Sequence, residues 1–333
     1  MRSVGEGGVV WLGGGMEVID AAAVRQVLDP GALVAALREA FAEPGRVVVP
    51  EREHYPVDEA LEATLLVMPA WQRGGFVGVK VVGHFPQNRG RGIPGLFGSY
   101  LLSSATTGEP VAVLDGTELT RWRTAAASAL AADSLAPATV GEHLLVGAGN
   151  VAAAIPACYA AVREVGLTRV WSRTPAGAED LVARLRAEGR PAEVAPDLRE
   201  AVRRADVITA ATSATSPLVL GEDVTPGTHV DLIGAFTPTM VEADPALITS
   251  ASVFVDVPEA LHEAGDLTGP LRDGILQESD ILADLSALAA GHHPGRRTAE
   301  EVTLFKSVGT ALEDLVAAGL VWEAWSGART DLQ

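Results

Sequence analysis

The chain has very little cysteine and few aromatic residues. Cys158 is the single cysteine in 333 residues, so no intrachain disulfide can form, and this is typical of a reducing compartment. Aromatic residues make up 5% of the chain, whereas hydrophobic residues make up 48%. That balance favours parallel sheets covered by helices. We therefore expect a cytoplasmic α/β protein in which Cys158 packs within a helix.

Positive charge and long apolar runs are also lacking. The 25 Lys and Arg residues are outnumbered by 43 Asp and Glu, and the net charge is −18, without a basic stripe. This argues against binding to nucleic acid or to an anionic membrane. No apolar run reaches the roughly 18 residues of a membrane span. Residues 1–15 lack a signal-peptide pattern, and we expect them to be a disordered extension before Met16. The remainder is long enough for two domains.

The strongest local signal is the stretch 143–157, HLLVGAGNVAAAIPA. An apolar strand leads into Gly147, Gly149 and Ala152, a G-x-G-x-x-A turn, and alanines then open a helix. Such glycines permit a sharp bend and a close approach of backbone to a pyrophosphate, which the helix N-terminus attracts. We predict that this turn, with Asn150 and Val151 inside it, binds a dinucleotide.

The next predicted strand, 168–171, indicates which dinucleotide is bound. It ends in Ser172, Arg173 and Thr174, and no acid stands there to accept hydrogen bonds from a ribose 2′-hydroxyl. An Arg at this place accommodates a 2′-phosphate. The sequence favours NADP(H), with NAD(H) as a further possibility.

Further strands are predicted at 207–211, 230–234 and 252–256, alternating with helical segments, and Thr212 follows the first of them as a cofactor-lining hydroxyl. This alternation is typical of a doubly wound parallel sheet, a Rossmann fold. Before it, helices at 20–41 and strands at 63–68, 76–82, 96–103 and 110–114 precede a long helix at 116–136. The stretch 303–325 has an amphipathic stripe that includes Leu304.

Two cations stand where local structure does not favour them. Lys80 interrupts the apolar strand VGVKVV, and an unpaired buried ammonium is costly. Arg123 lies early in the predicted helix 116–136, where the helix dipole disfavours a cation. Lys80 must therefore either reach the surface with its ammonium or meet an anion. The position of Arg123 is better explained by an anion partner, and we interpret Arg123 as a ligand residue.

Several motifs occur together in a fixed order over nearly the whole chain after Met16. They are Pro50-x-Arg52, Met68-Pro69-Ala70, Gly78-Val79-Lys80, Thr107-Gly108, Ala112-Val113-Leu114-Asp115-Gly116, Arg123-Thr124-Ala125-Ala126 and Gly147-x-Gly149. In this combination the sequence resembles the ornithine cyclodeaminase/mu-crystallin family. The resemblance implies a homodimer, a substrate and dimerisation domain (1–122 with 304–333) of α+β type, and a Rossmann domain (123–303). It also implies that Arg52, Lys80 and Arg123 grip a substrate carboxylate, with Thr124 at the cofactor.

The chain departs from the cyclodeaminase pattern at two positions. Leu66 and Phe236 stand where cyclodeaminases have acidic residues that handle the amine and a proton. Together with Met68, such apolar side chains suit the face of a small ring. The resemblance is therefore to the branch that reduces cyclic ketimines. We expect an NAD(P)H-dependent oxidoreductase that transfers hydride to C2 of Δ1-pyrroline-2-carboxylate or Δ1-piperideine-2-carboxylate, giving proline or pipecolate.

The imine nitrogen must also be protonated. His54 lies two residues after Arg52, on the same side of a strand, and is the first candidate to position that proton. His84 is a second candidate, and Asn88 is placed near the carboxylate. No histidine has the acid or cysteine partners of a metal site.

Three alternatives stay open. An ornithine or lysine cyclodeaminase would release ammonia with catalytic cofactor, whereas an alanine dehydrogenase or a related amino-acid dehydrogenase would use an open-chain oxo acid with ammonium. A non-catalytic NADP(H)-dependent binder of small molecules would need no hydride geometry. The sequence does not decide the preferred ring size of an imino acid substrate or the pathway that it serves.

Overall fold

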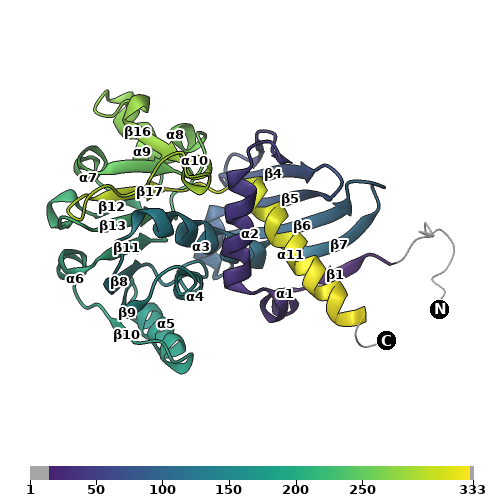
Figure 1. Cartoon of the computed structure of the whole chain (residues 1–333), viewed down its shortest axis with the longest axis horizontal. Coiled ribbons are helices and arrows are strands. Elements are labelled where there is room, and N and C mark those ends of the chain that lie inside the picture. The colour runs from purple at the N-terminus through teal and green to yellow at the C-terminus, as the bar shows by residue number, and fades with distance from the viewer. Residues whose placement is uncertain (1–14, 331–333) are drawn as a thin grey trace.

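In the computed structural model, which describes residues 15–330, two sheets lie side by side with helices between and around them (Figure 1). The larger sheet is entirely parallel and has the order β10-β9-β8-β11-β13-β17-β15-β16. Its strands are β8 (Val140–Val146), β9 (Val165–Trp171), β10 (Ala192–Val194), β11 (Val207–Ala210), β13 (His229–Leu232), β15 (Ser252–Val255), β16 (Ile281–Asp284) and β17 (Thr303–Lys306). This arrangement confirms the predicted doubly wound fold.

The strand order reverses between β8 and β11. From β8 the chain first adds β9 and β10 on one side and then returns to place β11 on the other. Ligands of open parallel sheets bind outside the carboxyl ends of the strands at such a reversal. The predicted glycine turn follows β8 directly, so it lies at this point. The helix after it begins later than expected: residues 151–154 form turns, and α4 spans Ile155–Tyr159.

The second sheet has the order β1-β7-β6-β5-β4-β2, with β3 paired to β4. Its strands are β1 (Glu17–Ile19), β2 (Val47–Val48), β3 (Glu53–Asp58), β4 (Ala63–Gln72), β5 (Phe76–His84), β6 (Leu96–Ser104) and β7 (Pro110–Asp115). Strands β4 to β7 form an antiparallel meander, and β1 joins β7 in parallel. Buried and more exposed residues alternate along β5 and β6, so the sheet covers the core with one face.

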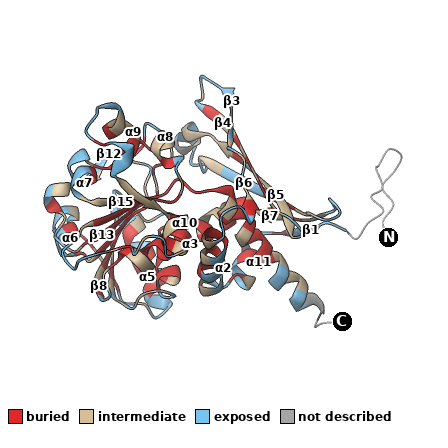
Figure 2. Ribbon diagram, turned by 45° about the horizontal axis from the view of Figure 1, so that its top comes forward, coloured by how far each residue is buried: buried red, intermediate tan, exposed pale blue. Residues whose placement is uncertain are grey.

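Helices fill the space between the sheets, and buried residues gather there (Figure 2). The aspartates before α1 (Ala21–Val27), α2 (Pro30–Ala42) and α3 (Gly116–Leu135) accept hydrogen bonds from their first turns, as preferred N-caps do. The last helix, α11 (Ala311–Thr330), returns to lie beside α2 and across the second sheet (Figure 1). The remaining helices are α5 (Pro175–Ala187), α6 (Leu198–Arg204), α7 (Pro245–Ser250), α8 (Ala260–Glu263), α9 (Gly265–Arg272) and α10 (Leu285–Ala289).

The stretch 303–325 was predicted as one amphipathic segment, but the structure divides it into a strand and a helix. Leu304 belongs to β17 in the parallel sheet, and α11 begins only at Ala311. Gly309 separates the two elements with a φ of +78°, which L side chains rarely adopt. The predicted domain boundaries therefore fall inside regular elements, at 122/123 within α3 and at 303/304 within β17, and the division into domains stays a prediction. Of the predicted N-terminal extension, residues 1–14 lie outside the described residues.

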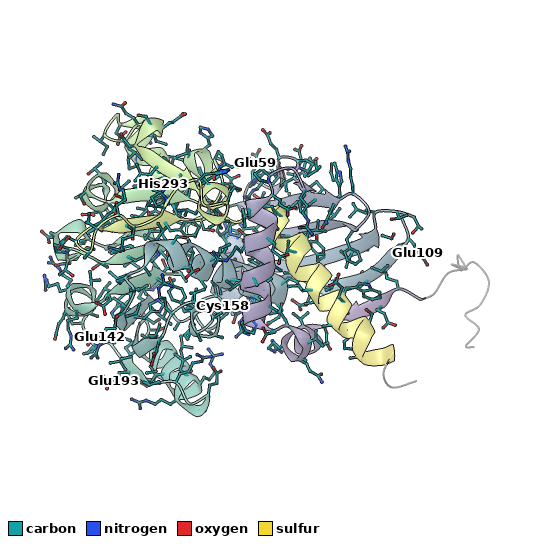
Figure 3. The ribbon with its side chains drawn as sticks, viewed as in Figure 1. Glu59, Glu109, Glu142, Cys158, Glu193 and His293 are labelled. Carbon is teal, nitrogen blue, oxygen red and sulfur yellow. The ribbon has the colours of Figure 1, made fainter. Side chains whose placement is uncertain are left out.

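The single cysteine is part of the core. Cys158 in α4 is fully buried, and burial raises the pKa of its thiol to about 12, so it packs as a small apolar side chain. Figure 3 labels it where α4 approaches α2. No helix within residues 15–330 is long and apolar enough to cross a membrane.

Candidate active site

A pocket of about 360 Å³ opens between the two sheets, at the carboxyl ends of β11 and β13. It brings together side chains from both sheets, from α3 and from the segment after β17. The lining residues include Arg52, Leu66, Met68, Lys80, Thr120, Arg123, Thr124, Gly149, Val151, Thr212, Gly234, Phe236 and Gly309. All three predicted carboxylate-binding cations, and all three predicted apolar residues, therefore lie around one cavity.

Lys80 lies on the helix-facing side of β5 and is 2% exposed. Its Nζ is 2.6 Å from Asp314 Oδ2 and 3.4 Å from the hydroxyl of Thr120. Burial and the neighbouring Arg123 lower the pKa of Lys80 to about 8, against the opposing effect of Asp314. The Lys80 amine is therefore mostly protonated at neutral pH but loses its proton more readily than an exposed lysine.

Arg123 lies well inside α3 and pairs with the first turn of α11. Its Nη1 donates to Glu313 Oε2 at 2.8 Å, and its Nε is 3.2 Å from Asp314 Oδ1. Burial raises the pKa of Glu313 to about 7, although Arg123 opposes this shift. The anion partners that the position of Arg123 predicted are thus partly carboxylates of the chain itself. Nη2 of Arg123 makes no hydrogen bond to residues 15–330, so one arm of the guanidinium is free for a ligand.

Arg52 approaches the pocket from the segment before β3. It donates to the carbonyls of Gly309 and Val308, and its Nε is 3.2 Å from Glu263 Oε1. The carbonyl-bearing segment is itself held by Asp256, which accepts from the Ser307 hydroxyl and from backbone N–H groups at 308 and 309. Arg52 is therefore held at the wall of the pocket by Glu263 and by the segment that follows β17.

The glycine turn has the features that a pyrophosphate requires. Gly147 has a φ of +113°, and a Cβ there would lie 2.7 Å from the carbonyl of Ala211. A Cβ on Gly149 would meet nothing within 4 Å, so this position faces open space. Ala152 is 1% exposed against the strand. These are the three roles assigned to the G-x-G-x-x-A residues, and the turn fits a dinucleotide.

The end of β9 lies beside this turn. A Cβ on Gly177, in the first turn of α5, would contact Thr174 Oγ1, Ser172 Oγ and the side chain of Ala148 from the glycine turn. Thr174 precedes α5 without capping it through its side chain. Arg173 is exposed and makes no ion pair with residues 15–330. Two hydroxyls therefore lie beside the glycine turn, and the exposed Arg173 stands between them in the sequence.

The predicted histidine and amide candidates do not line the pocket. His54 shares a sheet face with Leu66 but is exposed at its surface. Partial desolvation by its neighbours and the charge of Arg52 lower its pKa. His84 packs edge-on against Phe236, with ring centroids 5.7 Å apart. The side chain of Asn88 donates to the carbonyl of Pro94 at 3.3 Å. None of the three is among the residues that line the pocket.

Sequence reasoning missed the acidic residues around the cations. Glu313 and Asp314 are both 0% exposed, although they were included in an amphipathic segment. Two adjacent acids on the buried side of an otherwise apolar helix would have been the available signal. No group of three or more His, Cys, Asp or Glu side chains within residues 15–330 is arranged to hold a metal ion.

Residues 12–329 match the ornithine cyclodeaminase/mu-crystallin family. An uncharacterised protein of Schizosaccharomyces pombe is 43% identical over 305 residues, 87% of this chain and 92% of that protein. A Δ1-pyrroline-2-carboxylate reductase of Colwellia psychrerythraea is 34% identical over 315 residues, 92% of this chain and 99% of that protein. The solved structure of the Thermococcus litoralis Δ1-pyrroline-2-carboxylate reductase with NADH and L-proline superposes with a TM-score of 0.90 at 30% identity, covering 94% of this chain and 98% of that one. The chain belongs to the ornithine cyclodeaminase/mu-crystallin family.

Proposed function

We propose that this enzyme, an NAD(P)H-dependent oxidoreductase that acts on imines, reduces the cyclic ketimines Δ1-pyrroline-2-carboxylate and Δ1-piperideine-2-carboxylate to proline and pipecolate. One observation carries the proposal: three cations converge on a pocket whose remaining wall is apolar at Leu66 and Phe236. A cyclic imino acid presents one carboxylate and one apolar ring face, which matches this division. The resemblance to Δ1-pyrroline-2-carboxylate reductases over most of the chain supports the same substrate class.

The carboxylate is held by the pocket cations. The free Nη2 of Arg123 and the Lys80 ammonium can donate to it, and such charge-assisted hydrogen bonds are among the strongest in proteins. Leu66 and Met68 are 6% and 4% exposed and cover the ring, which excludes water from the reacting carbon. When bound at the glycine turn, NAD(P)H supplies the hydride. The contacts to the carboxylate and to the ring together fix the orientation of C2 toward the cofactor.

Protonation of the ring nitrogen falls to Lys80 in this proposal. Its ammonium lines the pocket, and a pKa of about 8 is near the working pH, which favours proton transfer. His54 does not line the pocket, but it is exposed and can exchange protons with solvent.

NADP(H) is the proposed cofactor, with NAD(H) as a weaker alternative. The exposed Arg173, with Ser172 and Thr174 beside it, offers a cation and two hydroxyls to a 2′-phosphate. Residues 172–174 include no acid that could accept hydrogen bonds from the ribose 2′-hydroxyl of NAD(H), and this favours NADP(H).

We further propose a homodimer through the uncovered face of the second sheet. Pro69, Val79, Leu101, Val113 and Val18 are successive cross-strand neighbours on that face. Leu101 is 42% exposed and Val18 is 73% exposed. The other three residues are half-buried, and a partly exposed apolar row of this kind is typical of an interaction surface.

The test is NADPH oxidation with each cyclic ketimine, beside pyruvate plus ammonium and beside ornithine with NAD⁺. Turnover of a cyclic ketimine that is lost in Lys80→Ala and Arg123→Ala supports the proposal. Ammonia release from ornithine, without oxidation of NADPH by either ring, would make the enzyme a cyclodeaminase. Preference for pyruvate plus ammonium would make it an alanine dehydrogenase, and cofactor-dependent binding without turnover would make it a binder.

A further inference from the structure

Glu242 is a buried carboxylate in the short strand β14 (Val241–Ala243), which pairs with β12 (Thr215–Val219) away from the main sheet. It is 0% exposed and does not line the pocket. Taking a carboxylate out of water is costly unless its oxygens accept hydrogen bonds. Its contacts therefore indicate what the residue does.

Both oxygens of Glu242 accept from the loops that form one wall of the pocket. Oε1 accepts from the backbone N–H and the hydroxyl of Thr212, both at 2.8 Å. Oε2 accepts from the backbone N–H groups of Gly234 and Ala235 at 2.8 and 3.1 Å. Thr212 follows β11 and Gly234 follows β13, so one carboxylate connects the ends of two adjacent strands.

The backbone of Glu242 is in turn held by a second buried carboxylate. Asp266 of α9 accepts from the backbone N–H groups of Glu242 and Ala243 at 2.7 and 3.0 Å. Lys306 of β17 is 2.9 Å from Asp266 and 3.8 Å from Glu242 Oε2. Lys306 and Asp266 are both 0% exposed, and within residues 15–330 they are the charged side chains that influence Glu242.

The two connected loops face the space between the glycine turn and the cations. Thr212 and Gly234 line the pocket together with Gly149 of the glycine turn and with Lys80. A dinucleotide held by its pyrophosphate at the glycine turn must place its nicotinamide in this space to reach a substrate at Lys80. The two loops are packed closely together, because a Cβ on Gly234 would collide with the backbone of Thr212.

We propose that Glu242 is a positioning residue that fixes the Thr212 and Gly234 loops as a rigid wall for the nicotinamide end of the cofactor. This inference rests on the proposed use of a nicotinamide dinucleotide at this site. It assigns Glu242 no contact with substrate or cofactor. The carboxylate acts through the two loops, and it needs both oxygens as acceptors to hold them.

Protonation would weaken this arrangement. A neutral carboxyl carries a hydrogen on one oxygen, which then faces donors instead of accepting from them. Burial raises the pKa of Glu242 to about 6, with Asp266 adding to the shift and Lys306 opposing it. The wall should therefore loosen as the pH falls through about 6.

The experiment compares NADP⁺ with 2′-phospho-ADP-ribose, the same molecule without nicotinamide, by calorimetric binding to the wild type and to Glu242→Gln. NAD⁺ and ADP-ribose are run in parallel. In Glu242→Gln we expect the dinucleotides to bind roughly ten- to a hundredfold more weakly, since two acceptor contacts are disturbed. The fragments should bind with unchanged affinity. Asp231→Asn is the matched control, because Asp231 is equally buried but accepts from Ser128, Tyr159 and Thr209 outside the pocket wall.

A second measurement uses the unaltered protein, so it stands even if Glu242→Gln does not fold. The ratio of the NADP⁺ and fragment dissociation constants should rise as the pH is lowered from 8 to 5, with its midpoint near 6. The 2′-phosphate titrates in both ligands and cancels from the ratio. A flat ratio, or equal weakening of both ligands in Glu242→Gln, would overturn the role of Glu242. Failure of the wild type to bind either dinucleotide would instead overturn the proposed function.

Discussion

Replacing Asp314 by Asn should move the alkaline limit of the reaction to lower pH. Asp314 Oδ2 is 2.6 Å from Lys80 Nζ, and both side chains are almost fully buried. With the carboxylate present, the pKa of Lys80 is about 8, because the opposing effects of burial and Arg123 exceed that of Asp314. Asn has nearly the same shape but no charge, so the substitution removes the interaction that favours the ammonium.

The size of the shift follows from the contact. An opposite charge this close favours the charged form by roughly 1–3 pKa units, or about 1.4–4 kcal/mol. The pKa of Lys80 should therefore fall to about 5–7. Whether Lys80 holds the carboxylate or donates the proton, kcat/KM declines as the pH rises through that pKa. A fall of two units would lower kcat/KM at pH 8 by about 50-fold, while activity near pH 5 would change far less.

The assay is kcat/KM for NADPH oxidation by a cyclic ketimine between pH 5 and 9. Glu313→Gln is the control, because Glu313 is equally buried in the same helical turn but pairs with Arg123 rather than with Lys80. Its alkaline limb should stay near that of the wild type. An unchanged limb in Asp314→Asn, or an equal shift in both variants, would refute the assignment of that limb to the Lys80 and Asp314 pair.

Three further predictions concern other parts of the molecule. Arg173→Ala should raise KM for NADPH about tenfold, the loss of one charge-assisted hydrogen bond, and leave KM for NADH unchanged; equal effects on both would remove Arg173 from the phosphate site. His143 is fully buried, and burial lowers its pKa to about 4, so the unfolded chain binds a proton first and stability falls between pH 6.5 and 4 by up to about 3 kcal/mol. Urea unfolding of His143→Gln should lack this contribution. Leu101→Lys should convert a dimer to a monomer in sedimentation, whereas Ile275→Lys, an exposed residue in the loop after α9, should not; a monomeric wild type would also contradict the proposed interface.

Much of the site was predictable from residues that conflict with their local setting. Lys80 interrupts an apolar strand, where an unpaired ammonium is costly, and Arg123 was expected near a helix N-terminus, where the dipole disfavours a cation. Both line the pocket. Gly147 and Gly149 were recognisable because a tight turn between strand and helix restricts which residues fit. His54 stays a prediction: it lies on the same sheet face as the pocket residue Leu66 but is not part of the pocket lining, since strand alternation gives the face of a residue but not its distance from a cavity.

The sequence by itself determined the parallel sheet and the glycine turn, because these depend on spacing within short segments. It also singled out Lys80 and Arg123 by their local setting, whereas Arg52 was indicated by the family resemblance alone. Only the tertiary structure decided which carboxylates those cations meet. Asp314 reaches Lys80 from a helix more than two hundred residues later in the chain, and Glu242 connects two strand ends across the sheet. Such contacts depend on where separate elements pack, and local periodicity carries no information about that.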